Sequence, residues 1–268
     1  YLAATDAFNT DWQRDLALVH VRIGNIAQTQ NRLEDALTAY RDYLAIFANL
    51  SGTDPYNLGW QRELAVAHQS IGDIALAQDR PDDALSAYRK GLDILKHLAA
   101  TDTFNTDWRV DLALAHAKIG DIAQAQDRLD DALSAYHDCL AIFEGLAAID
   151  PSNVGWQREM TVANGRIGDI VKAQDRPDDA LAAYQKAVDI AQHLVDTDPS
   201  NARWKHALAI AQSQLGQAFQ VMESYVEAQA NFRNSVETMK LAIALSTSNM
   251  DWTQDLASLE SWLNSEAS

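Results

Sequence analysis

Residues 71–88 read IGDIALAQDRPDDALSAY, and this stretch decides the fold. Its first part places apolar residues such as Ile71 and Ile74 at helical spacing, so one side of a helix is apolar. A short polar segment then interrupts the pattern, and Pro81 suits the first turn of a new helix. Because apolar residues return at helical spacing up to Tyr88, the stretch predicts two helices joined by a tight turn.

Outward from this stretch, the same pattern returns every 48 residues along the chain. Recurrence at a fixed period is typical of repeat architectures, in which each unit buries its apolar faces on its neighbours. We therefore expect one array of five helical hairpins, with repeats over approximately 8–51, 56–100, 104–148, 152–196 and 200–246. The registers that carry the repeat are Trp12, Trp60, Trp108, Trp156, Trp204 and Trp252; Gly24, Gly72, Gly120, Gly168 and Gly216; Ala36, Ala84, Ala132, Ala180 and Ala228; and Tyr40, Tyr88, Tyr136, Tyr184 and Phe232.

The two ends of the array differ. A last helix over 250–266 has Trp252 and Leu259 on one side and polar residues on the other, so it is predicted to cap the array. At the other end, residues 1–4 correspond to the tail of a preceding second helix. The first hairpin is therefore expected to present an uncapped edge, either because further repeats precede it or because two copies associate through it.

The spacing within each unit resembles the tetratricopeptide repeat family. The family signature has a Leu/Ile-Gly pair, an Ala twelve residues after the Gly and an aromatic residue four positions later, matched by Ile71-Gly72, Ala84 and Tyr88. The match holds in all five units, and long repeats of this kind are similar to those of large bacterial signalling proteins. The resemblance implies an all-α, right-handed superhelical solenoid of antiparallel hairpins.

The repeat is longer than the family's usual period of about 34 residues. Because the Gly-to-Ala spacing is unchanged, the turn inside the hairpin cannot contain the extra residues. If the two helices share them equally, each helix gains about seven residues, or about 10 Å.

Composition limits the kinds of partner and site. Lys and Arg number 21 against 38 Asp and Glu, giving a net charge of −17, so a nucleic-acid partner is not expected and a basic protein is favoured. The same charge could serve only solubility. No apolar run is long enough for a membrane span. With Cys139 as the single cysteine, a reducing, cytoplasmic location is expected.

No pattern in the sequence predicts catalysis, a metal site or a cofactor. The histidines His20, His68 and His116 occupy equivalent places in successive repeats, but packed helices lie about 8–10 Å apart, too far for shared zinc ligands. The recurring acidic pairs, such as Asp82-Asp83, stand where the helix dipole favours negative charge. Cys139 lies on an apolar stripe and is expected to be buried and inert.

The resemblance implies a concave groove lined by the first helices, at positions three before, one after and four after the motif glycine. Amide side chains there could bond to the backbone of an extended peptide, and the aspartates would attract Lys or Arg. The position three before the glycine carries no base, so chaperone-tail binding is not expected. The candidate groove residues are Asn25, Gln28, Gln69, Asp73, Asp121, Gln124, Asp169, Lys172, Gln217 and Gln220.

These observations favour a non-catalytic scaffold that binds a protein or peptide segment in an acidic and amide-lined groove. One alternative is a spacer that self-associates through the repeat edges or through the convex surfaces. Another is the sensing arm of a larger signalling enzyme, with the chemistry elsewhere.

Overall fold

The computed structural model is all-α and describes residues 9–246 and 251–265. The chain divides into two compact units, unit 1 over Tyr1–Ile122 and unit 2 over Ala123–Ser268. The expected helix tail at 1–4 and the outermost residues of the expected cap, 250 and 266, lie outside the described residues.

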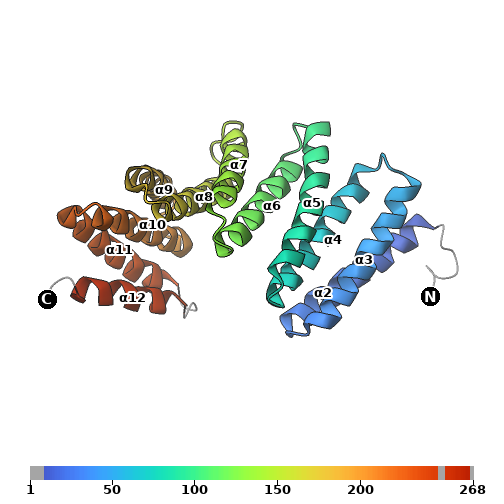
Figure 1. Cartoon of the computed structure of the whole chain (residues 1–268), viewed down its shortest axis with the longest axis horizontal. Coiled ribbons are helices and arrows are strands. Elements are labelled where there is room, and N and C mark those ends of the chain that lie inside the picture. Colours follow the sequence, from blue (N-terminus) through green and yellow to red (C-terminus); the bar gives the residue numbers. More distant parts are fainter. Residues whose placement is uncertain (1–8, 247–250, 266–268) are drawn as a thin grey trace. The chain divides into compact units, whose positions relative to one another are not determined.

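The described helices follow one another in pairs joined by three-residue turns, with a final helix after the fifth pair (Figure 1). The first helices of the pairs have 20 residues each and the second helices 19 to 21, so the extra residues of the long repeat are shared almost equally, as expected. In chain order the helices are α2 (Thr10–Thr29), α3 (Leu33–Thr53), α4 (Leu58–Ala77), α5 (Pro81–Thr101), α6 (Thr106–Ala125), α7 (Leu129–Ala147), α8 (Val154–Ala173), α9 (Pro177–Thr197), α10 (Ala202–Val221), α11 (Tyr225–Leu245) and α12 (Asp251–Ser265).

An asparagine caps the start of each first helix. The side chain of Asn57 accepts a hydrogen bond from the backbone N–H of Trp60 at 3.1 Å, which satisfies one donor that the helix itself leaves unpaired. The same bond is made by the asparagines at equivalent places in the other repeats, Asn9, Asn105, Asn153 and Asn201. This Asn-x-x-Trp step sets where each first helix begins.

The turn inside each pair reverses the chain with one residue in the left-handed region. In the first pair this residue is Asn31, at φ 55°. The backbone N–H of Arg32 donates to the carbonyl of Ala27 at 2.8 Å, and that of Asn31 donates to the carbonyl of Gln28 at 2.9 Å. These two bonds satisfy carbonyls in the last turn of the helix. The later turns place Asp79, Asp127, Asp175 and Glu223 in the same conformation.

The motif glycines let the two helices of a pair approach closely. A Cβ at Gly168 would lie 2.4 Å from Cε1 of Tyr184, and one at Gly72 would lie 2.9 Å from Cζ of Tyr88. The aromatic ring of the second helix therefore rests directly on the backbone of the first. Gly72 and Gly168 are therefore positions where the two helices of a pair pack closely.

In unit 1, the core is built between each second helix and the first helix that follows it. Tyr43 and Phe47 of α3 are buried together with Ala67 of α4, and their rings meet edge to face with centroids 5.2 Å apart. The next layer buries Leu95 and Leu98 of α5 against α6. Each pair thus covers an apolar face that it cannot bury alone, which is the physical basis of the repeat.

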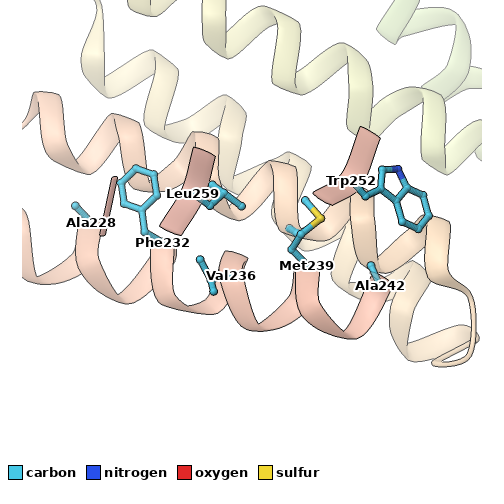
Figure 2. Close-up of a cluster of buried hydrophobic side chains, with 8 residues drawn as sticks. Ala228, Phe232, Val236, Met239, Ala242, Trp252 and Leu259 are labelled. Atoms are coloured by element: carbon cyan, nitrogen blue, oxygen red, sulfur yellow. The ribbon is translucent and has the colours of Figure 1, made fainter. Parts of the chain in front are cut away.

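In unit 2, α12 closes the last pair. Figure 2 shows Trp252 and Leu259 of α12 against the row of apolar side chains on α11 that includes Phe232 and Met239. The ring of Trp262 stacks on Phe232 with centroids 3.5 Å apart. The expected terminal helix is therefore present, and its apolar side is packed onto the array.

The first described helix keeps an exposed apolar stripe. Leu18, Val19, Ile23 and Ile26 of α2 are 44 to 54% exposed. Ile74, the equivalent of Ile26 in α4, is fully buried against the preceding pair. Val19 and Ile26 therefore lie on the face that α4 buries against the preceding pair through Ala67 and Ile74. The equivalents of Leu18 in α6 and α8, Leu114 and Val162, are themselves exposed.

Within the described residues, no helix combines the length and apolarity that crossing a membrane would require.

Candidate functional site

In unit 1, polar side chains connect consecutive first helices. Arg62 of α4 donates from Nε to Asp111 of α6 at 2.7 Å. Nearer the other end of the same two helices, Nζ of Lys118 lies 3.1 Å from Asp73. These pairs, 49 and 45 residues apart, place α4 and α6 side by side, with a polar face between them.

Unit 2 repeats this arrangement with α8, α10 and α12. Lys172 donates to Gln217 at 2.8 Å, and the amide of Gln214 lies 3.2 Å from Asp169. Between α10 and α12, Nε2 of His206 lies 3.0 Å from Asp255. The first helices of this unit therefore also form a continuous polar face. The helix α12 lies where the first helix of a further pair would lie.

The residue after the motif glycine accepts a hydrogen bond from a buried tyrosine. The hydroxyl of Tyr88 donates to Asp73 at 2.5 Å, and that of Tyr40 donates to Asn25 at 2.7 Å, with the side-chain oxygen of Gln28 also within 3.0 Å. In the fifth repeat the aromatic residue is Phe232, which has no hydroxyl, and the acceptor position holds Gln217. These groove positions thus also serve the fold, by satisfying a polar group at the edge of the core.

These contacts change the acidity of the tyrosines. Burial, reinforced by the charge of Asp169 and its hydrogen bond, raises the pKa of Tyr184 far above its ordinary value. Burial followed by the hydrogen bond and charge of Asp73 does the same to the pKa of Tyr88. Both hydroxyls therefore remain protonated donors at neutral and moderately alkaline pH.

The remaining predicted groove residues lie on the same helices but in different surroundings. Asp121 is exposed on α6, whereas Gln69 and Gln124 are half-buried. Lys172, Gln217 and Gln220 come together around a cavity of about 530 Å³ beside α12. The structure therefore gathers the predicted residues of unit 2 more tightly than their spacing alone indicated.

A second cavity of unit 2, with a volume of about 560 Å³, lies between α8 and α10 and beside Trp252. Three of the side chains that line it are arginines, Arg158, Arg166 and Arg203. Asp169 is the one carboxylate in its described lining. The chain as a whole has a net charge of −17, whereas the arginines make the lining of this cavity positively charged.

Sequence reasoning missed Arg158 and Arg203, because it considered only positions close to the motif glycine. Arg158 lies ten residues before Gly168, and Arg203 lies thirteen before Gly216. Both stand in the early part of the first helix. The signal that could have found the first of them is the 48-residue register, in which Arg14, Arg62 and Arg158 are equivalent.

The described side chains offer no arrangement for metal chemistry. Across residues 9–246 and 251–265, no three His, Cys, Asp or Glu side chains come close enough to hold a metal ion. Cys139 is buried in α7, as its place on the apolar stripe predicted. What the polar face can do chemically is donate and accept hydrogen bonds and pair with charges.

Several solved structures are similar to this chain over most of its length. BtubC (BKLC) from P. vanneervenii is 17% identical with a TM-score of 0.66, covering 92% of both chains. A kinesin-light-chain protein of Podosopora anserina with nearly identical TPR-like repeats is 13% identical with a TM-score of 0.57, covering 82% of this chain and 93% of that one. MamA is 17% identical with a TM-score of 0.52, covering 88% of this chain and 98% of that one.

No family model and no curated protein matches the sequence. At these identities, the structural likeness establishes the helical repeat fold and carries no statement about partners or activity.

Proposed function

We propose that this chain, a tetratricopeptide-like helical repeat protein by its fold, is a non-catalytic scaffold whose first helices bind a segment of another protein. The observation that carries this proposal is the polar face of consecutive first helices. Within each unit this face presents amide and charged groups on neighbouring helices, and in unit 2 it includes two cavities of about 530 and 560 Å³. A face of this kind suits an extended segment, whose backbone needs both donors and acceptors.

The candidate contacts are the amides and charged groups already placed on α2, α4, α6, α8 and α10. Asp73 shares its carboxylate with Tyr88 and Lys118, and Asp169 shares its carboxylate with Tyr184 and Gln214. A basic partner was expected because of these aspartates. Their intramolecular bonds leave less of each carboxylate for a partner, so the amides and the cavities are proposed as the main contacts.

The test uses a peptide-display selection against the chain and two labelled variants. Ser70→Cys places a thiol on the first-helix face of α4, one turn before Asp73, and Lys90→Cys places one on the exposed side of α5. Because Cys139 is buried, a bulky maleimide label attaches to the new cysteine selectively. The label on Ser70→Cys is expected to abolish binding of peptides selected on this part of the array, and the label on Lys90→Cys to leave binding unchanged.

If the selected peptides are displaced by the label on α5 and not by the one on α4, the first-helix face is not the binding surface. If no peptide is selected, the scaffold proposal itself loses its support. Circular dichroism of both labelled variants checks that the helices are intact.

Self-association is a second candidate function, favoured by the exposed stripe of Leu18, Val19, Ile23 and Ile26 on α2. A two-fold dimer formed through this stripe would use the α2 face of both copies, because such an interface presents the same surface on each partner. Sedimentation at several concentrations, with Val19→Lys as the variant, tests it. A monomer at all concentrations contradicts this second function and leaves the first untouched.

A further inference from the structure

The contact that joins α4 to α6, and its equivalent that joins α10 to α12, has no counterpart between α8 and α10, beside the cavity of about 560 Å³. Arg62 of α4 reaches Asp111, 49 residues further on, and His206 of α10 reaches Asp255, again 49 residues further on. The equivalent residue of α8 is Arg158, and 49 residues after it stands Ala207. A carboxylate that would pair with Arg158 across the two helices is therefore replaced by a methyl group.

Arg158 keeps a local partner. Its guanidinium lies 2.8 Å from Glu159, the adjacent residue on the same helix, and its side chain is 58% exposed. An exposed pair of this kind contributes little and is readily exchanged. Arg158 is thus available to an anion that enters between α8 and α10.

Arg203 adds a second positive charge where the other repeats have none. Its equivalents are Asp11, Gly59, Asp107 and Gly155. Within the described part of the chain the Arg203 side chain makes no ion pair or hydrogen bond, and it is exposed at the cavity. Two guanidinium groups from neighbouring helices therefore border one cavity.

The rest of the lining is mostly small or apolar. Ala207 contributes only a methyl group, and Gly165 has no side chain, so that the amide of Gln214 lies close over it, 3.0 Å from where its Cβ would be. Val162 and Ile210 supply apolar surface. At one end, Trp252 is held by its packing on α11 (Figure 2) and by stacking on His206, with ring centroids 4.7 Å apart. Asp169 is already bonded to Tyr184 and Gln214, so its charge is engaged within the fold.

We propose that this cavity holds an acidic side chain of the bound protein segment. The carboxylate of that Asp or Glu takes the place of the missing carboxylate at position 207, between Arg158 and Arg203, and a neighbouring apolar side chain of the segment packs on Val162 and Ile210. Arginine suits this role because its planar fork matches a carboxylate. The inference rests on the proposed scaffold function and names the chemistry of one contact.

The two arginines lie outside the motif positions, although Gly165 and Asp169, which also line the cavity, lie three before and one after Gly168. Because both arginines stand ten or more residues before the motif glycine, the longer first helix of the 48-residue repeat is what carries the charge pair. We therefore expect the cavity to contact the side chains of the bound segment, while the amide side chains near the motif glycine form hydrogen bonds with its backbone.

The test uses a fluorescent peptide of alternating Glu and Leu, blocked at both ends, with a matched peptide in which Gln replaces Glu. Binding to the whole chain is measured by anisotropy at low salt. The Glu peptide is expected to bind at least about tenfold more tightly than the Gln peptide, and to weaken as salt is added. A third peptide has no acidic side chain but keeps a free C-terminal carboxylate. Its affinity shows whether the cavity prefers a side-chain carboxylate or the C-terminal carboxylate of a chain.

Two variants test directly the role of the carboxylate that is absent at position 207. Arg158→Gln removes one guanidinium, and Ala207→Asp supplies the carboxylate found at Asp111, so that Arg158 pairs within the fold. Both variants are expected to bind the Glu peptide about tenfold or more weakly than the unmodified chain does. Two control variants are expected to change the affinity for the Glu peptide by no more than about twofold. Ala207→Asn has the size of the Asp variant without its charge. Arg62→Gln removes an arginine of unit 1 that is already paired with Asp111.

Equal affinity for the Glu and Gln peptides, tighter binding of the free C-terminal carboxylate, or loss of binding in Ala207→Asn but not in Ala207→Asp would overturn this inference. If the Glu peptide fails to bind while display-selected peptides still bind the first-helix face, only the acidic-pocket inference is wrong. If neither binds, the scaffold proposal fails with it. Helicity and urea midpoints of all variants show that each is folded.

Discussion

The hydroxyl of Tyr184 lies 2.6 Å from Oδ1 of Asp169, so an aspartate on the polar face is also the acceptor for a side chain buried in the core. The same relation joins Tyr88 with Asp73. An aspartate that recurs in a repeat protein can therefore be retained for the packing of the repeat itself. This double role separates the residues of the polar face that hold the fold from those that are available to bind.

Replacing Tyr184 by Phe is expected to lower the free energy of unfolding by about 1 kcal/mol, since one hydrogen bond is lost while Asp169 keeps Gln214 and partial solvent contact. Phe232 shows that a phenyl ring fits this place in the fifth repeat. Urea denaturation measures the change. A double-mutant cycle with Asp169→Asn should show coupling between the two sites; strict additivity would show that the hydrogen bond contributes nothing.

Replacing Gly168 by Ala is expected to destabilise the protein by about 1–3 kcal/mol, because the new methyl group would overlap the ring of Tyr184 at 2.4 Å. Gly52 provides the matched control, since it is a helical glycine with nothing within 4 Å of the place that a methyl group would take. Gly52→Ala is expected to be neutral or to stabilise by up to about 1 kcal/mol. Thermal and urea unfolding compare the pair, and equal effects at the two sites would contradict the packing argument.

Replacing Glu223 by Gly is expected to stabilise the protein by up to about 1 kcal/mol. Glu223 adopts φ 59° in the turn after α10, a conformation that costs energy for a residue with a Cβ and none for glycine. The control is Glu227→Gly, four residues later in the first turn of α11, which should destabilise by about 1 kcal/mol. A loss of stability in Glu223→Gly would show that its side chain has a role other than the turn.

Lowering the pH is expected to destabilise unit 1 partly through His68. Burial, and after it the charge of Lys90, lowers the pKa of His68 below its ordinary value of 6.5. Between the folded and unfolded pKa values the unfolded chain binds more protons, so this contribution is present above about pH 6.5 and is lost as the pH falls through the folded pKa.

His68→Asn tests this contribution, because Asn164 occupies the equivalent place in α8. Urea midpoints at neutral pH and at a pH about one unit below the ordinary histidine pKa are compared for the two proteins. The acid-induced loss is expected to be smaller in the variant, and an equal loss would assign the effect to other groups.

Much of the fold follows from local sequence. The 48-residue registers, the tight turn and the apolar spacing predicted paired helices of similar length and a terminal helix, and these features are present. The asparagine caps could have been predicted as well, since Asn57 and its equivalents keep the same period, three residues before each tryptophan of the 48-residue register. Such features depend on contacts within a few residues, where the helical spacing alone brings side chains together.

The candidate site depended on contacts that local spacing does not fix. The sequence placed Asp73 and Asp169 on the polar face, but it did not reveal that each accepts a bond from the core tyrosine fifteen residues later. It also put Arg62 and Arg158 in the same register, while only the packed helices show that one meets Asp111 and the other borders a cavity beside Ala207.

Residues 45 to 49 positions apart become neighbours only when successive hairpins stack, and their lateral offset is set by the packing of side chains between the helices. The sequence by itself therefore determined the repeating unit, because helical spacing and turn chemistry act within a few residues. The tertiary structure decided which charges are paired and which border an open cavity, because those contacts exist only between helices of different repeats.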